Sequence, residues 1–252
     1  MPPLRGIAPA PNDLVTREGG SRPYLILLAS DFNYYYCKAP HLMTNHQYMG
    51  VNEIVASHLA RHLGVPTRPV ELVEWEDHLH VGLQVLPNDR KMTGSLTETT
   101  IARLSNSQVF YPLVVLDAWT INQDRHDGNW LGGVLGKDVG WFLANDHDMC
   151  LLAAGFQPAQ LAGMVDQPID SRIIRSQVIA DEIRSPFALR KAIDEAERIT
   201  PADIRHVVDG VPDQWLDGAG KALLASFLID RQGRLGDLFA ASLGLFAKLE
   251  RL

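Results

Sequence analysis

The chain has 252 residues, of which 46% are hydrophobic and 21% charged, as expected of a globular protein with one large domain or a two-lobed unit. Its net charge of -7 argues against nucleic acid binding along the whole chain, so we expect no direct nucleic-acid partner. No apolar run approaches the roughly 18 residues of a membrane-spanning helix, and no span is expected. The two cysteines, Cys37 and Cys150, lie far apart without a CxxC spacing, which favours a reducing, cytoplasmic location over a disulfide framework.

The first third of the chain is predicted to form strands and one helix. The predicted strands are residues 24–28, 32–37, 70–75 and 78–86, and the predicted helix is residues 51–63. The turn residues Ser30 and Asp31 indicate that the first two strands form an antiparallel hairpin. Apolar residues recur at helical spacing in the helix, which Gly64 ends. The proline-rich residues 1–14 are expected to be a flexible N-terminus, followed by an N-lobe over residues 15–87.

Beyond a break at Pro87, the chain is predicted to become mostly helical, and residues 88–252 are assigned to a C-lobe. An apolar helix over residues 111–121 leads into a polar loop, residues 122–129. Two strands follow at residues 130–135 and 141–144, separated by a glycine-containing turn, which indicates a second hairpin. Thr200 and Pro201 are a good helix start, because threonine is a preferred cap and proline fits the first helical position.

The polar loop carries the most informative spacing, an aspartate at position 124 and an asparagine at position 129. Phosphoryl transfer to a hydroxyl needs a carboxylate that orients the acceptor and a neutral oxygen ligand that helps to hold Mg²⁺. Asp124 and Asn129 supply both from one short turn. An aspartate in a loop can also simply cap backbone amides, so a structural role for Asp124 stays open.

Three further residues fit the same chemistry. Lys38 ends the second predicted strand and can bind nucleotide phosphates, although a solvated lysine is the alternative. Glu53 in the following helix can pair with it. Asp146 follows the second hairpin and can bind Mg²⁺ beside Asn129, with Asp148 as an alternative ligand. Strand lysine, helix glutamate, loop Asp/Asn and hairpin aspartate, in this order, are the parts of a kinase-type phosphotransferase.

The polar loop and several other segments of the chain resemble a known family. Asn-x-Asp-Arg-His-x-x-Asn, present at residues 122–129, resembles the catalytic loop of HipA-like kinases, and Asp-Arg-His-x-x-Asn is similar to that of phosphatidylinositol 3- and 4-kinases. The other matching segments, within roughly residues 20–150, are Arg22-Pro23-Tyr24-Leu25, Tyr36-Cys37-Lys38, Asn52-Glu53, Leu63-Gly64-Val65-Pro66 and Asp146-His147. The chain departs from full-length HipA toxins in being much shorter.

The resemblance implies an α+β, two-lobed protein-kinase-like fold that uses ATP and Mg²⁺ to phosphorylate a Ser/Thr hydroxyl of a protein. It implies Asp124 as catalytic base, Asn129 and Asp146 as metal ligands, and Lys38, held by Glu53, as the nucleotide contact. His126 is also a candidate catalytic residue, either bracing the loop or contacting the transferred phosphoryl group. The resemblance also leaves room for an antitoxin-like partner.

The sequence alone leaves alternative functions and the roles of some residues open. A lipid or small-molecule kinase on the same fold, or a nucleotide-binding module without activity, are the alternative functions. Gly19-Gly20-Ser21 is the nearest approach to a Gly-rich phosphate loop, but it is expected to precede the first strand. Arg125 is expected to brace the loop through Asp117 or Asp146. His58 and His62 share a helix face, which we interpret as a solvated face and not as a metal site.

Overall fold

The computed structural model describes residues 2–9, 25–38, 47–86, 96–135, 139–152 and 156–250. Its strands are β1 (Leu4–Pro9), β2 (Leu25–Ala29), β3 (Tyr34–Lys38), β4 (Val70–Trp75), β5 (His78–Gln84), β6 (Trp130–Leu135) and β7 (Val139–Ala144). Its α-helices are α1 (Met49–His62), α2 (Glu98–Ile101), α3 (Phe110–Trp119), α4 (Gln177–Glu182), α5 (Pro186–Glu197), α6 (Pro201–Asp209), α7 (Gly218–Gln232) and α8 (Leu235–Ser242). Short 3-10 helices lie at Ser107–Val109, Pro158–Met164 and Leu243–Leu245. The fold is therefore mixed α+β, as predicted.

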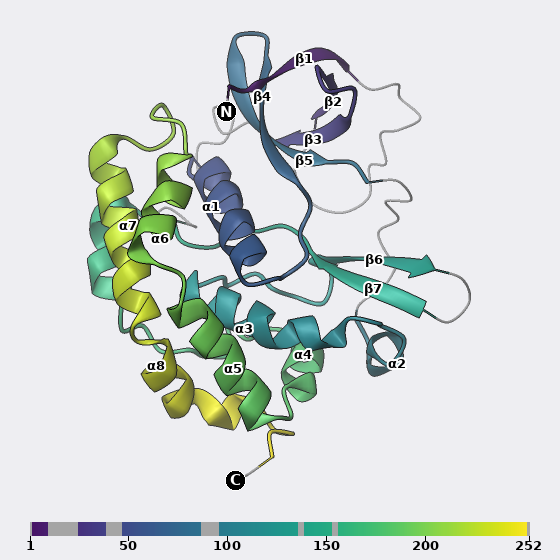
Figure 1. Ribbon diagram of the computed structural model, residues 1–252, viewed down its shortest axis with the longest axis vertical. Coiled ribbons are helices and arrows are strands. Elements are labelled where there is room, and N and C mark those ends of the chain that lie inside the picture. Colours follow the sequence, from purple (N-terminus) through teal and green to yellow (C-terminus); the bar gives the residue numbers. More distant parts are fainter. Residues whose placement is uncertain are drawn as a thin grey trace.

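The first strands close into a barrel in the order β1-β2-β3-β5-β4. Neighbouring strands are antiparallel except for β1 and β4, which run parallel and close the barrel. Figure 1 shows the barrel at one end of the molecule and the helices at the other, with α1 between them. The barrel places the end of β3, and hence Lys38, next to α1.

The prediction of a flexible segment over residues 1–14 is wrong for Leu4–Pro9, which form strand β1. The prolines misled the prediction, because proline is poorly suited to strand interiors. Here Pro9 is the last residue of the strand and lies opposite Leu27 of β2, while Gly6 lies opposite Ala29 of β2 and Leu4 opposite Val73 of β4.

The other predicted elements of this region are present with small shifts at their ends. The hairpin of β2 and β3 is antiparallel as predicted, with Leu27 opposite Tyr35. Strand β3 begins at Tyr34 and not at Phe32, because Phe32 lies in the turn with a positive φ of 63°. The predicted lobe boundary at Pro87 and the turn at residues 136–138 lie outside the described residues.

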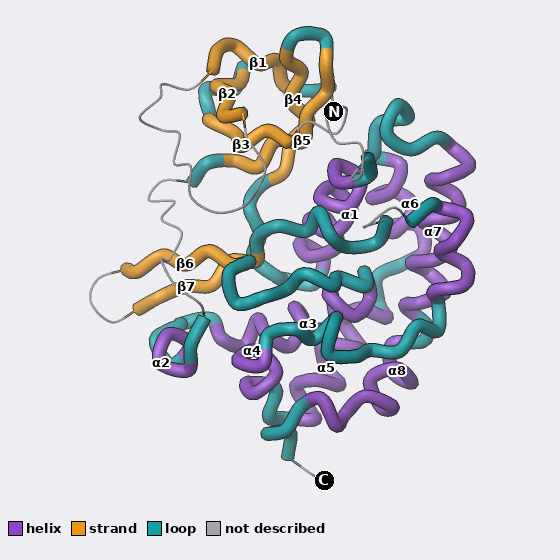
Figure 2. Tube along the Cα trace, turned by 180° about the vertical axis from the view of Figure 1, so that it is seen from behind, coloured by secondary structure: helices purple, strands orange, loops and turns teal. Residues whose placement is uncertain are grey.

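The remainder of the described chain is helical apart from the antiparallel hairpin of β6 and β7, which was also predicted. Figure 2 shows this hairpin projecting beside α2, away from the larger helices. The predicted start of α6 is confirmed, since Thr200 and Asp203 form a capping box and Pro201 is the first helical residue. The last part of the chain forms two helices, with α7 ending at Gln232 and α8 beginning at Leu235.

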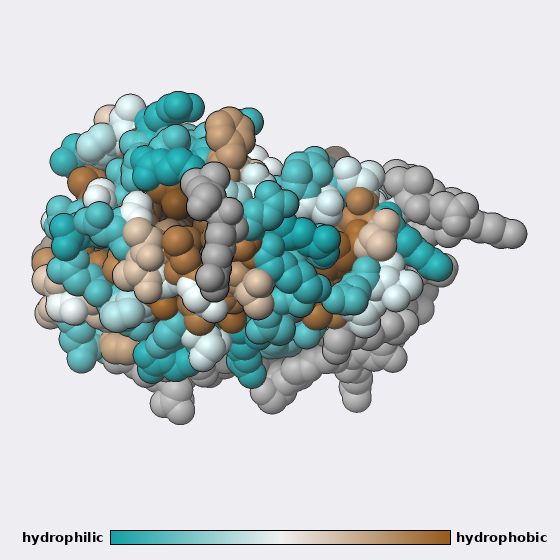
Figure 3. Space-filling model, turned by 90° about the horizontal axis from the view of Figure 1, so that it is seen from below, coloured by the Kyte–Doolittle hydropathy of each residue, from teal (hydrophilic) through white to brown (hydrophobic). Residues whose placement is uncertain are grey.

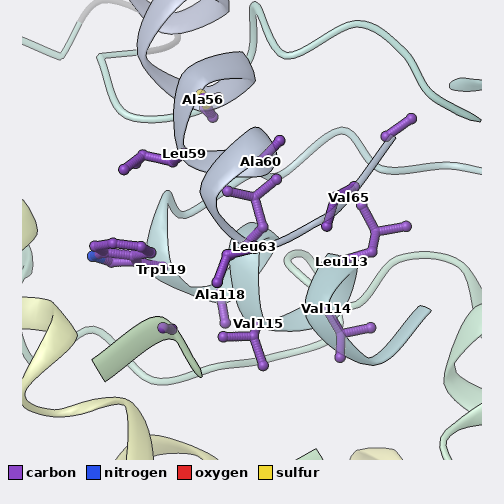
Figure 4. Packing of buried hydrophobic residues seen from close by; sticks show 14 of the residues in the cluster. Ala56, Leu59, Ala60, Leu63, Val65, Leu113, Val114, Val115, Ala118 and Trp119 are labelled. Carbon is purple, nitrogen blue, oxygen red and sulfur yellow. The ribbon is translucent and has the colours of Figure 1, made fainter. Parts of the chain in front are cut away.

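The hydrophobic core joins α1 to α3, the helix that leads into the polar loop. In Figure 4, Leu59 and Ala60 of α1 and Leu63, the residue after this helix, gather with Leu113 and Ala118 of α3 in one core cluster. Trp119 at the end of α3 is fully buried, and its indole N–H donates to the carbonyl of Leu228 in α7 at 2.8 Å. A buried aromatic of this kind stabilises a fold by about 3–5 kcal/mol relative to alanine. The polar loop therefore starts from a fixed point in the core.

The surface mixes polar and apolar side chains. Figure 3 shows a face on which hydrophilic residues surround smaller hydrophobic patches. None of the helices in the described ranges has the length and hydrophobicity that crossing a membrane would require. Both cysteines are buried and unpaired; burial raises the pKa of the Cys37 thiol to about 12, which leaves it a small hydrophobic side chain.

Candidate active site

Lys38 lies at the centre of a cluster of carboxylates. It is the last residue of β3, is almost fully buried, and its Nζ donates to Glu53 Oε2 at 2.8 Å and to Asp146 Oδ1 at 2.7 Å. Asp148 Oδ2 lies 3.6 Å from the same ammonium. The predicted pair of Lys38 and Glu53 is present, and the alternative of a solvated lysine is wrong.

Glu53 connects Lys38 to the segment after β7. It is fully buried on α1, and its Oε2 also accepts a hydrogen bond from the backbone N–H of His147 at 3.2 Å. Its neighbour Asn52 reaches the same segment: Asn52 Nδ2 donates to the carbonyl of Asp148 at 2.8 Å, and Asn52 Oδ1 accepts from the N–H of Leu152 at 3.1 Å. The sequence placed Asn52 in a motif without assigning it this role. Two adjacent residues of α1 thus hold the position of Asp146 to Asp148.

The loop at residues 122–129 is closed by hydrogen bonds between its own ends. Asn129 Nδ2 donates to the backbone carbonyl of Asp124 at 2.6 Å and to Asp124 Oδ2 at 3.1 Å. Asn122 Oδ1 accepts from the Asp124 N–H at 3.1 Å. The second carboxylate oxygen of Asp124, Oδ1, accepts from Arg175 Nη1 at 2.8 Å. Asp124 remains partly exposed, with 32% of its side chain accessible to solvent.

Arg125 braces the loop, as expected, and its carboxylate partner is Asp117. Arg125 Nε lies 3.1 Å from Asp117 Oδ2, and Arg125 Nη1 donates to the carbonyls of Asn129 at 2.9 Å and Asn145 at 2.7 Å. Arg125 Nη2 lies 2.9 Å from His147 Nδ1. Because a guanidinium only donates, His147 Nδ1 is the acceptor and its proton resides on Nε2. One buried arginine therefore joins α3, the loop and the segment after β7.

His126 has a bracing contact. Its Nδ1 accepts from the backbone N–H of Gly128 at 2.9 Å, within the same turn. Gly128 has little room for a larger residue, because a Cβ there would lie 2.9 Å from the His126 ring. This contact supports the bracing role of His126; its contact with a transferred phosphoryl group stays a prediction.

The β6–β7 hairpin brings the two proposed metal ligands to the same end. Trp130 pairs with Ala144, so Asn129 and Asn145 lie opposite each other just outside the paired residues, and Asp146 follows. Asp146 has a positive φ of 63°, an uncommon conformation for a residue other than glycine that re-aims its side chain. In this arrangement the carboxylate of Asp146 lies against Lys38, while its neighbour Asp148 is more deeply buried.

The charges of this cluster are set by burial and by the two cations. Burial raises the pKa of Asp146, but the charge and hydrogen bond of Lys38 outweigh it and hold this pKa well below its usual range. Burial raises the pKa of Asp117 against the opposing effect of Arg125. Burial and the charge of Arg125 lower the pKa of His147, so this imidazole is neutral, in agreement with its role as an acceptor.

The chemistry of the donor set fits Mg²⁺. The amide nitrogen of Asn129 is engaged with Asp124, which leaves its Oδ1 as the atom for a metal, and Asp146 offers a carboxylate. Mg²⁺ prefers oxygen ligands and usually binds one or two protein side chains together with substrate phosphates. Within the described ranges, His, Cys, Asp and Glu side chains form no group of three or more that could hold a metal by themselves.

Other residues that the sequence singled out lie elsewhere or cannot be placed. His62 on α1 is exposed as predicted, whereas His58 is half-buried, so the interpretation of a solvated face is wrong for His58. Gly19-Gly20-Ser21 lies outside the described residues, but it does not precede the first strand, because β1 comes before it in the chain. The segment containing these glycines connects the antiparallel strands β1 and β2.

Comparison with solved structures identifies the class of fold. The chain is similar to the proinflammatory kinase CtkA of Helicobacter pylori, with a TM-score of 0.65 and 14% identity over 99% of this chain and 100% of that chain. It also matches HipA of Shewanella oneidensis, solved in complex with HipB and operator DNA, with a TM-score of 0.47 and 13% identity over 86% of this chain and 58% of HipA. The likeness to CtkA shows a shared fold. The TM-score for HipA is too low to support a structural argument.

The family follows from the sequence match. The model of the HipA-like kinases matches residues 14–231, and the chain belongs to this family. The resemblance predicted from the sequence is thereby confirmed. No curated protein matches the chain at a significant level.

Proposed function

We propose that this protein is a kinase that transfers the γ-phosphate of ATP, with Mg²⁺, to a Ser/Thr hydroxyl of a protein. The barrel with α1 would be the N-lobe, the helical part the C-lobe, and nucleotide would bind between them near Lys38. Membership of the HipA-like kinase family supports phosphotransferase activity. The acceptor, the cofactors and the roles of single residues are the proposed part.

One observation carries the proposal: residues from three distant segments meet around Lys38 and the polar loop. Lys38 bonds Glu53 on α1 and Asp146 after β7, although Lys38 and Asp146 are 108 positions apart. Arg125 then links the loop to the same segment through Asn145 and His147. Buried charges are costly unless they are paired, and the charges paired in this network belong to residues that the proposal assigns to phosphoryl transfer.

Each residue has a definite proposed task. Asp124 orients the acceptor hydroxyl and takes its proton, and Asn129 fixes the carboxylate of Asp124 while turning its own oxygen to the metal. Lys38, kept in place by Glu53, donates hydrogen bonds to phosphate oxygens. Asp146 and Asn129 hold Mg²⁺, which when bound neutralises phosphate charge. His126 keeps the turn of the loop closed.

The test is transfer of label from ATP labelled in its γ-phosphate. The protein is incubated with labelled ATP and Mg²⁺, alone and with cell extract, beside Asp124→Asn, Asp146→Asn and a control, Asp170→Asn, whose carboxylate bonds Arg172 at the surface. We expect labelled protein bands with the unmodified protein and the control, and losses of about 100-fold or more in the other two variants, as for removal of a general base or a metal ligand.

Other outcomes decide between the alternatives. Label found only in lipids or small molecules would assign the same chemistry to a different acceptor. Nucleotide binding, measured by calorimetry, without any transfer would instead favour a kinase-like binding module. An antitoxin-like partner is a separate proposal, tested by co-purification of the full chain with the product of a neighbouring gene.

A further inference from the structure

An arginine outside the predicted motifs contacts the proposed catalytic base. Arg175 lies just before α4, and its Nη1 donates to Asp124 Oδ1 at 2.8 Å across 51 positions of sequence. Asp124 Oδ2 is already engaged by Asn129 at 3.1 Å. Each carboxylate oxygen of Asp124 thus has a donor, and among the described residues the donor to Oδ1 is the one from outside the loop.

The residues around Arg175 are buried, whereas its own side chain is half-exposed. Ile173, Ile174 and Ser176 are buried, and the Ser176 hydroxyl bonds the carboxylate of Asp127 in the loop. The Arg175 side chain is 51% exposed and meets Asp124 at the surface. A side chain that is anchored at its Cα and solvated at its end can swing away from Asp124 without moving the fold.

The hydroxyl of an acceptor needs the position that Arg175 holds. A general base must lie within about 2.6–3.2 Å of the oxygen whose proton it accepts. Since Asn129 engages Oδ2 as part of the loop, we assign Oδ1 to an incoming acceptor. The guanidinium and the acceptor hydroxyl then compete for it.

We propose, on the basis of the proposed function, that Arg175 is a positioning residue that caps Asp124 in the resting site and is displaced by the acceptor. The cap keeps the carboxylate of Asp124 oriented when no acceptor is bound. It opposes acceptor binding weakly, because an exposed ion pair is worth little. Nucleotide binding near Lys38 is independent of it.

The test separates acceptor affinity from nucleotide affinity and from turnover. KM for the acceptor, KM for ATP and kcat are measured for Arg175→Ala, Arg175→Gln and Arg175→Lys. The acceptors with a measured KM are a protein labelled in the extract experiment and dephosphorylated casein; transfer to water, the third acceptor, is measured only as a rate of phosphate release. Arg172→Ala is the matched control, since Arg172 is an exposed arginine of the same segment whose bonds are to Asp170.

We expect Arg175→Ala and Arg175→Gln to lower the acceptor KM by up to about fivefold, which corresponds to about 1 kcal/mol. KM for ATP and kcat should stay within about twofold of the control, and Arg175→Lys should lie between. If the acceptor KM of Arg175→Ala and Arg175→Gln equals or exceeds that of Arg172→Ala, the proposed capping role of Arg175 is wrong. A tenfold fall in kcat would also overturn it and would place Arg175 on the transferred phosphoryl group.

Failure of this inference is distinct from failure of the proposed function. If the unmodified protein transfers label to none of the three acceptors, the kinase proposal fails and the cap fails with it. If the unmodified protein is active and the Arg175 variants match Arg172→Ala, only the cap is wrong. Thermal unfolding of each variant checks that the protein is folded.

Discussion

The ammonium of Lys38 lies 2.7 Å from Asp146 Oδ1 while it also bonds Glu53, so one buried cation balances carboxylates from two different segments. Asp148 lies close enough, at 3.6 Å, to share the same charge. Lys38 therefore has a structural role, because it joins the carboxylates of two segments, and it is also a candidate nucleotide contact. The two roles can be separated by experiment.

Lys38→Met should lower the free energy of unfolding by about 3–5 kcal/mol, because Glu53 stays buried without its cation. Chemical denaturation monitored by tryptophan fluorescence measures this. The control is Lys38→Met combined with Glu53→Gln, which removes the stranded charge and should recover part of the loss. A Lys38→Met protein as stable as the unmodified one would show that the carboxylates are protonated or solvated.

Arg125→Met should destabilise the fold by a similar amount, about 3–5 kcal/mol, because Asp117 is left charged in the core. Arg125→Lys should recover little, since one ammonium cannot reach Asp117, two carbonyls and His147 together. Arg172→Met is the control at an exposed ion pair and should change stability by less than about 1 kcal/mol. Equal effects at both arginines would contradict the bracing role.

Ser176→Ala tests whether the start of α4 positions the loop. Ser176 caps α4 through the N–H of Ile179 and also bonds Asp127, whereas Ser185 caps α5 through Ala188 and has no bond to the loop described here. Each alanine variant should lose about 1 kcal/mol of stability as a helix cap. Only Ser176→Ala should also reduce kcat for phosphoryl transfer. If Ser176→Ala and Ser185→Ala reduce kcat equally, the loss of kcat reflects lower stability and not the position of the loop.

The stability of the fold should fall as the pH drops below about 6.5, in part through His58. Burial, and then the charges of Arg61 and His62 on the same helix and His206 on α6, lower the pKa of His58 from 6.5. The unfolded chain therefore takes up this proton first as the pH falls, which favours unfolding between 6.5 and the lower folded-state pKa. We expect His58→Gln to lose less stability than the unmodified protein between pH 7 and pH 5, measured by urea denaturation. If the free energy of unfolding falls by the same amount in both proteins between pH 7 and pH 5, the role of His58 is contradicted.

The elements that the sequence predicted well are those with strong local signals. β4 was predicted with its observed bounds, and the start of α6 followed from local residues such as Thr200 and Pro201. The pair of Lys38 and Glu53 followed from the order of motifs. These features depend on neighbours in sequence or on a resemblance that fixes their spacing.

What was missed depends on contacts between distant segments. β1 has a weak strand signal and is held by pairing with β2 and β4, which no local pattern reports. Arg175 has no motif around it, and its place beside the loop becomes visible only in the fold, where the neighbouring Ser176 bonds Asp127. Likewise, Asn52 was in a predicted motif, but its bonds to residues about 100 positions away become visible only in the fold.

The position of β1 has a practical consequence for anyone who trims this protein. The matched family region begins at residue 14 and ends at residue 231, so a protein cut to these limits would lack β1 and α8. Without β1, the facing edges of β2 and β4 would present unpaired amides to solvent, and such edges invite pairing between chains. Poor solubility of a trimmed protein would then reflect an opened barrel and would say nothing about the quality of its active site.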